Sequence, residues 1–204
     1  MKKGFTLLEM LVVIGIIAVL IGAVIGGYNA AIDKAQTAKA QELVYEVATA
    51  LEQVYQKDDS WPRPIRLEGS TGNGQITPEV GGVLAKRGAL SLTYRADEMD
   101  GTTIYRLSGQ NRFGVVTPWA DAVIKRHAKG EGVTLTTKVP SGGTIETHRL
   151  HFAIDEDGNG KVNVTGEGIT ANVRATVCVW CAGKDGKFGT KDDVKSWTKG
   201  QEIQ

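Results

Sequence analysis

Residues 1–32, MKKGFTLLEMLVVIGIIAVLIGAVIGGYNAAI, decide how this chain is built. Lys2 and Lys3 come first, Glu9 follows, and from Met10 to Ile32 no residue carries a charge. At about 1.5 Å per residue, a helix over this uncharged run measures roughly 34 Å, enough to cross a hydrocarbon core of about 30 Å. The rest of the chain has no second run of this kind, so we expect a single membrane anchor.

Two simple interpretations of this segment leave residues unexplained. A secretory signal peptide would use Lys2 and Lys3 and a cleavage site such as Ala38-Lys39-Ala40, but its apolar stretch spans only about 7–15 residues. A plain membrane anchor explains the length and the lysines but not Glu9. An ionised carboxylate inside a membrane costs about 2.5–3.5 kcal/mol, so Glu9 is expected to have a function.

Residues 2–9, Lys-Lys-Gly-Phe-Thr-Leu-Leu-Glu, closely resemble the cleavage and methylation signal of type IV prepilins and of the pseudopilins of type II secretion. The resemblance implies that residues 1–4 are a leader, that a prepilin peptidase cuts between Gly4 and Phe5, and that the new amine of Phe5 is methylated. It also implies an assembly role for Glu9, whose carboxylate pairs with the Phe5 amine of a neighbouring subunit. A buried charge needs such a partner.

The helical pattern continues beyond the apolar run. Val44, Val47, Leu51 and Val54 recur at intervals of three and four, which predicts one apolar face. Prolines 62 and 64 forbid further helix. We therefore predict one helix over 5–56, whose first part, 5–32, is the transmembrane segment and filament core and whose second part buries its stripe against a head.

The remaining residues, 57–204, are predicted to form an antiparallel β-rich head, which makes the fold α+β. Thr77 before Pro78 is expected to start a short helix. Strands are expected at 102–107, at 133–139 and at 175–180. Strands at 151–154 and 161–164 are expected to pair as a hairpin around Asp155-Glu156-Asp157-Gly158-Asn159-Gly160, which also matches the first half of a calcium-binding EF-hand loop.

Composition excludes several classes of function. The chain has 204 residues with 24 Lys and Arg against 23 Asp and Glu, so no excess of positive charge is available for nucleic acid. No serine, histidine and aspartate lie in a catalytic pattern, so we expect no enzyme.

Cys178 and Cys181 are either a strained local disulfide or two buried thiols, and both alternatives stay open.

Two segments of the head also resemble pseudopilins. Residues 117–121, Thr-Pro-Trp-Ala-Asp, resemble an aspartate-proline-tryptophan-glycine segment with its first and last members replaced. Residues 180–194 resemble the glycine- and aspartate-rich C-terminal loop, which implies a calcium site with Asp185, Asp192 and Asp193 as ligands. Calcium takes six to eight oxygen ligands on a flexible backbone, and Lys184, Lys187 and Lys191 would dilute the negative field there.

The resemblance implies a structural subunit of a type IV pilus-like filament, and the two head segments favour a pseudopilin of a type II secretion system. The alternatives are a type IV pilus subunit and a singly anchored envelope protein that presents its head as a binding module. Expected partners are other copies of the chain in a helical filament, the prepilin peptidase and an inner-membrane assembly platform. The expected location is the bacterial inner membrane, with a single span and an extracytoplasmic head, before assembly into a periplasmic or surface filament.

Overall fold

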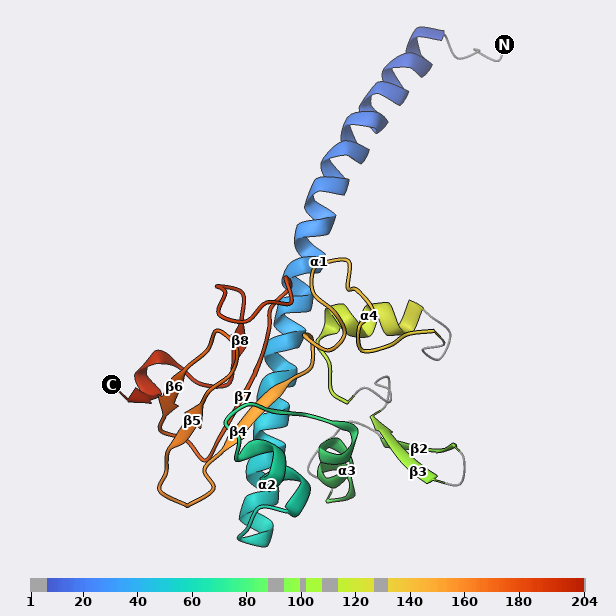
Figure 1. Ribbon diagram of the computed structural model, residues 1–204. Helices are drawn as coiled ribbons and strands as arrows, with labels where there is room; N and C mark the ends of the chain where they lie inside the picture. The colour runs from blue at the N-terminus through green and yellow to red at the C-terminus, as the bar shows by residue number, and fades with distance from the viewer. Residues whose placement is uncertain (1–6, 88–93, 100–101, 108–113, 127–131, 204) are drawn as a thin grey trace. The chain divides into compact units, whose positions relative to one another are not determined.

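The computed structural model describes residues 7–87, 94–99, 102–107, 114–126 and 132–203, with the backbone alone for 23–27, 94–99, 102–107 and Lys125 (Figure 1). The chain divides into two compact units between Ala38 and Lys39. One helix, α1 (Leu7–Asp58), crosses this division and matches the helix predicted over 5–56.

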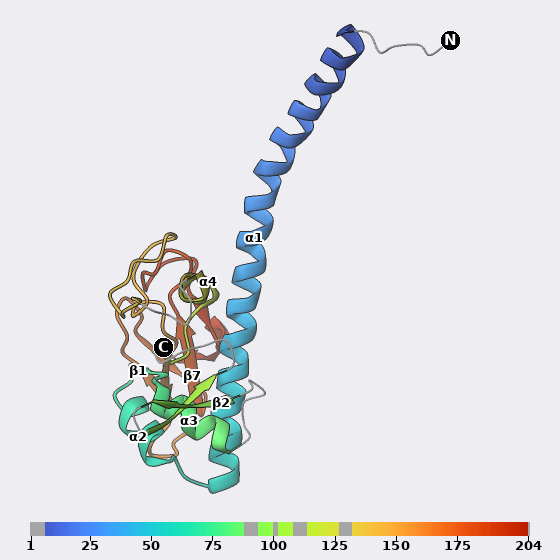
Figure 2. The same ribbon diagram turned by 90° about the vertical axis from the view of Figure 1, so that its right-hand side faces the viewer.

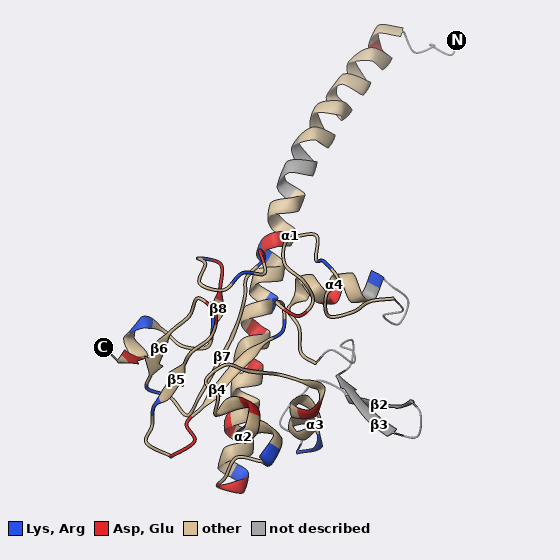
Figure 3. Cartoon of the chain, viewed as in Figure 1, with Lys and Arg blue, Asp and Glu red and all other residues tan. Residues whose placement is uncertain are grey.

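In the first unit, α1 is apolar on every side from Leu7 to Ile21, apart from Glu9. Its large side chains from Leu7 to Ile21 are exposed, and up to Ile32 its only charged residue is Glu9 (Figure 3). A helix that is apolar all round is suited to burial in a membrane or in an assembly, because water opposes its exposure on every face. Within the residues whose side chains are described, no helical stretch combines the length and the apolarity needed to span a bilayer.

In the second unit, α1 buries one face. Val44, Val47, Leu51 and Val54 are at most 1% exposed, which confirms the predicted stripe. Burial of each such side chain contributes about 1.5–3 kcal/mol. The packing of this half of α1 against the head is therefore a principal source of the head's stability.

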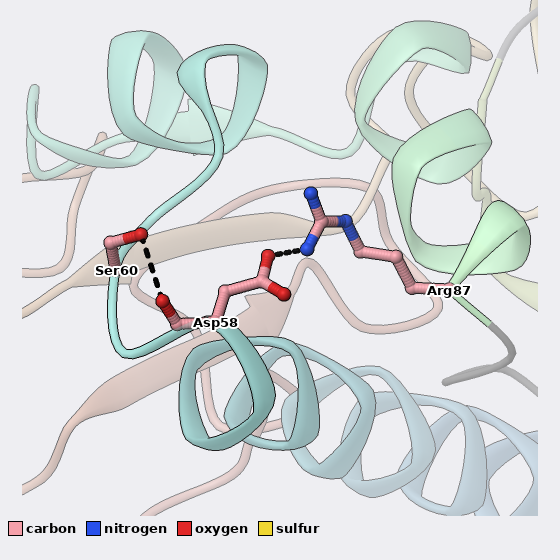
Figure 4. Close-up of polar contacts among 3 residues, drawn as sticks. All are labelled: Asp58, Ser60 and Arg87. Atoms are coloured by element: carbon pink, nitrogen blue, oxygen red, sulfur yellow. Dashed lines mark hydrogen bonds and ion pairs between the residues drawn. The ribbon is translucent and has the colours of Figure 1, made fainter.

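The C-terminal end of α1 is connected to the end of the third helix by an ion pair. Asp59 adopts a positive φ of 50°, which turns the chain out of the helix before Pro62. The Asp58 carboxylate forms an ion pair with Arg87 at the end of α3 (Pro78–Lys86), and the Ser60 hydroxyl donates to the Asp58 carbonyl at 3.2 Å (Figure 4). Both charged side chains are partly exposed, so the pair contributes at most about 1 kcal/mol.

A four-stranded antiparallel sheet forms the centre of the head (Figures 1 and 2). Its order is β1 (Gly74–Gln75), β4 (His151–Ile154), β7 (Val177–Cys181) and β8 (Val194–Lys195). Every residue of β4 and of β7 is buried, so both faces of the central strands are covered. Such strands consist of consecutive apolar residues because neither face meets water.

The two faces of this sheet support two separate clusters of apolar side chains. The inner core contains the buried stripe of α1 together with Phe152, Val177, Val179 and Cys181. The outer core lies on the opposite face, and its buried members are Ala153, Val162, Val164, Ile169, Val173, Cys178, Trp180 and Trp197.

A second, three-stranded antiparallel sheet supplies part of the outer core. Its order is β5 (Val162–Val164), β6 (Ala171–Val173) and β9 (Glu202–Ile203). A short 3-10 helix, Lys199–Gln201, leads into β9. The C-terminal residues are therefore part of the folded head.

The remaining elements are short. They are α2 (Arg63–Gly69), α4 (Pro118–Arg126) and the antiparallel pair of β2 (Tyr94–Met99) with β3 (Thr102–Leu107). The long N-terminal helix followed by antiparallel sheets confirms the predicted α+β class.

Two sequence predictions about strands were wrong. The segment 133–139 forms turns with a single bridge between Lys138 and Thr144, and no strand runs through it. Strands do form at 151–154 and 162–164, but β4 pairs with β1 and β7, while β5 pairs with β6. The loop between them carries the chain from one sheet to the other and is not the turn of a hairpin.

Candidate processing and assembly site and the C-terminal loop

The processing site and the assembly carboxylate lie close together in the sequence, and the structure describes only the second. Gly4 and Phe5 are outside the described residues. Glu9 lies in the first turn of α1 and is exposed. A carboxylate is favourable there, because the unpaired N–H groups of the first turn carry partial positive charge.

The surroundings of Glu9 give this carboxylate its chemical importance. The side chains of Leu7, Leu8, Met10 and Leu11 are all more than half exposed. Any apolar environment that covers them would also cover Glu9, and removal of its charge from water is unfavourable unless an opposite charge accompanies it. The first turn of α1 therefore favours a cationic partner once it is buried.

The carboxylates of the three aspartates in the C-terminal loop accept hydrogen bonds from groups within the same loop. The Asp185 carboxylate accepts the Lys187 N–H at 2.9 Å, and the Asp193 carboxylate accepts the Gly189 N–H at 2.7 Å. One Asp192 oxygen accepts the Thr190 hydroxyl at 2.6 Å. These contacts direct the three side chains toward donors within the loop.

Burial and hydrogen bonding shift the pKa values of the neighbouring Asp192 and Asp193 carboxyls in opposite directions. Partial burial raises the pKa of Asp193, although the donors from Gly189 and Thr190 oppose the shift. Burial favours a higher pKa at Asp192 as well, but the hydrogen bonds that the Asp192 carboxylate accepts from Thr190 and Asp185 outweigh this effect. The pKa of Asp192 is therefore lowered. Across the described residues, no three His, Cys, Asp or Glu side chains gather closely enough to share a metal ion. The carboxylates of the predicted calcium site thus do not converge in this structure.

The C-terminal loop is held to the head by backbone packing at glycines. A Cβ on Gly142 would overlap the carbonyl oxygen of Asp185, and a Cβ on Gly186 would lie 2.9 Å from both the His148 Nε2 and the Gly143 Cα. The three glycines therefore let two backbone segments touch where side chains would keep them apart. This junction positions the loop by contacts within the chain.

Two histidines that sequence reasoning left without a role are central to this region. His148 is fully buried, and its ring contacts the Thr117 hydroxyl and the Gly142 carbonyl. His151 is also buried, and its Nδ1 donates to the Asn73 side-chain oxygen at 2.7 Å. Their side-chain partners, Thr117 and Asn73, are 31 and 78 residues away, so no local pattern could have identified these two contacts.

The segment 117–121, which resembles a pseudopilin segment, lies at the start of α4. Thr117 precedes α4, and Trp119 and Ala120 in its first turn are buried in the inner core. The segment therefore packs within the head and anchors α4.

Comparison with known proteins gives two findings that agree with the geometry. The prokaryotic N-terminal methylation motif matches residues 1–25. The chain is 25% identical over 155 residues to the type IV major pilin protein PilE of Neisseria gonorrhoeae, an alignment that covers 74% of this chain and 92% of that protein. No solved structure matches the chain significantly.

The motif covers the segment in which Glu9 lies, and the pilin similarity covers most of the chain, including much of the head. A long N-terminal helix followed by antiparallel sheets is the architecture that this similarity leads one to expect. By this motif and by this similarity, the chain resembles type IV pilins.

Proposed function

We propose that this chain is a structural subunit of a helical, type IV pilus-like filament that assembles through the first part of α1. The observation that carries the proposal is the position of Glu9, the one charged residue between Leu7 and Ile32 in the otherwise uncharged first part of α1. The methylation motif over the same residues and the similarity to a major pilin support it.

Assembly in this proposal follows from charge and apolar surface. Cleavage between Gly4 and Phe5 creates an ammonium group, which methylation leaves charged. When helices from several subunits pack together, the Glu9 carboxylate of one subunit and the Phe5 amine of its neighbour lose water together, so each supplies the partner that the other needs. The aliphatic side chains around them drive association because their burial removes apolar area from water.

The same features lead to a proposed location and set of partners. Before assembly, residues 5–32 anchor the subunit once in the inner membrane, and Lys2 and Lys3 remain on the cytoplasmic side. The head then lies outside the cytoplasm. A prepilin peptidase acts at Gly4, and an inner-membrane assembly platform moves the processed subunit into the filament.

Two versions of the filament are supported by different observations. The glycine- and aspartate-rich loop at 180–194 and the segment 117–121 favour a pseudopilin of a type II secretion system. The similarity to the PilE major pilin favours a subunit of a surface pilus. Deletion of the gene separates them, because loss of an enzyme from the culture medium is expected for a pseudopilin and loss of surface fibres for a pilus subunit.

Calcium in the C-terminal loop is a further part of this proposal. Asp185, Asp192 and Asp193 would supply charge, and carbonyls turned by neighbouring glycines would supply the remaining oxygens. Because the three carboxylates do not gather at one point in the part of the chain that the structure describes, a shared ion would require the loop to rearrange.

Replacement of Glu9 tests the assembly proposal directly. In Glu9→Ala the subunit should still be cut, should stay in the membrane and should keep a folded head, while its amount in filaments falls at least about tenfold. Glu42→Ala is the matched control, because it removes an exposed carboxylate from the same helix in the second unit. Quantitative blotting of sheared filaments measures both. Assembly of Glu9→Ala at the parental level would contradict the proposed charge pair.

A further inference from the structure

Cys178 and Cys181 point into opposite faces of the central strand β7. Cys178 belongs to the outer core with Trp180, whereas Cys181 belongs to the inner core with Val179. Successive side chains of a strand alternate between faces, so residues three apart in sequence always diverge. Both thiols are free and fully buried.

The register of β7 fixes this divergence. Cys178 lies opposite Ala153 of β4, and Cys181 lies opposite Val194 of β8, so each is held by pairing with a different neighbouring strand. In an extended strand, Cα atoms three residues apart are separated by about 10 Å. A disulfide requires a Cα separation below about 7 Å and Cβ atoms that face each other. A disulfide between these two residues is incompatible with β7.

We propose that the Cys178-Val179-Trp180-Cys181 segment makes folding of the head dependent on redox state: the head reaches its native fold only while both thiols are reduced, and the native fold then shields them from oxidation. Folding and disulfide formation exclude each other in this segment. Whichever occurs first prevents the other.

The protective half of this device follows from burial. Burial raises the pKa of each thiol to about 12, with the nearby Asp193 and Asp192 carboxylates adding to the shift at Cys181. The thiolate is the reactive species, and relative to the ordinary value of 9.0 its population at neutral pH falls by about 1000-fold. Cys178 and Cys181 should therefore react with oxidants only when the head opens.

The sensitive half operates in the unfolded chain, where two cysteines separated by two residues approach each other freely. A small-molecule disulfide such as oxidised glutathione is the oxidant. One cysteine thiolate attacks it, forms a mixed disulfide and releases one glutathione thiolate. The second cysteine thiolate then attacks the protein sulfur of the mixed disulfide and releases the other. The two protein thiols lose two electrons in total, and one glutathione disulfide gains them to become two thiols.

The consequence for the cell rests on the extracytoplasmic location of the head proposed above, because disulfides form in oxidising compartments. There the head must fold before its cysteines meet an oxidant, or a dithiol reductant must rescue the chain. The incompatibility itself does not depend on location, so a test in vitro separates this inference from the proposed function.

Refolding of the full chain in detergent micelles tests the inference. The chain is unfolded in guanidinium with a reductant, and one half is then oxidised with oxidised glutathione before dilution. The reduced chain should regain the near-ultraviolet circular dichroism of its buried tryptophans, while the oxidised chain should not until dithiothreitol is added. The Cys178→Ala/Cys181→Ala variant should refold equally well with and without oxidant.

A thiol count on the unmodified protein tests the same inference without any variant. Native protein should react with a maleimide at least about 100-fold more slowly than the unfolded chain, and it should yield two free thiols after denaturation. An intact Cys178–Cys181 disulfide in the native protein would overturn the inference. Equal recovery of the native spectrum by the oxidised and reduced chains would overturn it as well.

Discussion

Thr117 and His148 are joined by two hydrogen bonds. The Thr117 N–H donates to the His148 carbonyl at 2.8 Å, and the Thr117 hydroxyl lies 2.8 Å from the His148 Nδ1. The other ring nitrogen, Nε2, lies 2.9 Å from the Gly142 carbonyl oxygen, which can only accept a hydrogen bond. Nε2 therefore carries the proton in the neutral ring, and Nδ1 accepts from the Thr117 hydroxyl. The imidazole connects the start of α4 to the turn that supports the C-terminal loop.

Removal of the Thr117 hydroxyl should destabilise the head. Thr117→Val keeps the shape of the side chain but leaves the buried Nδ1 without a donor, which costs about 1–3 kcal/mol. Thr117→Ser keeps the donor and should lose less. Urea unfolding followed by tryptophan fluorescence measures both variants, and equal midpoints for Thr117→Val and the parent would show that this hydrogen bond is unimportant.

Acid should destabilise the head through His151. Burial, assisted by the charge of Arg149, lowers the pKa of His151 from 6.5 to about 4. As pH falls below 6.5, the unfolded chain therefore takes up a proton that the folded head does not, and stability is lost until about pH 4, where the loss levels off. The shift corresponds to about 3 kcal/mol.

Urea unfolding at a series of pH values measures this loss, and His151→Gln is the matched variant because its amide can still donate to Asn73. The variant should lose less stability than the parent between pH 6.5 and pH 4. The buried His148, whose pKa is also lowered by burial, should give both proteins a residual slope in the same direction. Parallel curves for parent and variant would refute the assignment to His151.

A methyl group at Gly142 should loosen the junction under the C-terminal loop. Gly142 has a φ of 142°, and its Cβ would overlap the Asp185 backbone, so Gly142→Ala should cost at least about 2 kcal/mol. The matched control is Gly82→Ala, because Gly82 lies within α3 with no heavy atom within 4 Å of an added Cβ. That change should stabilise the head by up to about 1 kcal/mol. Similar unfolding midpoints for the two variants would contradict the tight packing at Gly142.

Calcium should raise the melting temperature of the full chain in detergent if the proposed loop site exists. An ion that binds only the folded state stabilises it by about 2.7 kcal/mol at a hundredfold excess over the dissociation constant. Magnesium should substitute poorly because it requires tighter octahedral geometry. Asp192→Ala combined with Asp193→Ala should abolish the effect, and identical melting with calcium and with chelator would remove the ion from the account.

Sequence patterns predicted those parts of the fold that depend on the local spacing of apolar residues and on residues that begin or end a helix. The spacing of Val44, Val47, Leu51 and Val54 gave the buried face of α1, because helical period and burial coincide there. Thr77 before Pro78 gave the start of α3, where the threonine hydroxyl accepts the Val80 N–H at 3.4 Å.

The sequence patterns failed where side-chain oxygens accept hydrogen bonds from backbone N–H groups that a neighbouring strand would otherwise bind. The alternation at 133–139 suggested a strand, but the Thr134 N–H donates to the Thr137 hydroxyl at 2.8 Å, and this local bond closes a turn. The expected hairpin failed because the Asp155 carboxylate accepts the N–H groups of Asn159 and Gly160, which turns the chain within the loop. The junction of Gly142, Gly186 and His148 was also missed, since it joins segments that are distant in the sequence.

The intact mass of the protein extracted from membranes tests the central claim most directly. The account predicts a polypeptide that begins at Phe5, lacks residues 1–4 and carries one added methyl group on its terminal amine, with the rest of the chain intact. Top-down fragmentation would locate the methyl group on Phe5. A chain that keeps Lys2 and Lys3, or one cut near Ala40 and released from the membrane, would contradict the assignment as a processed filament subunit.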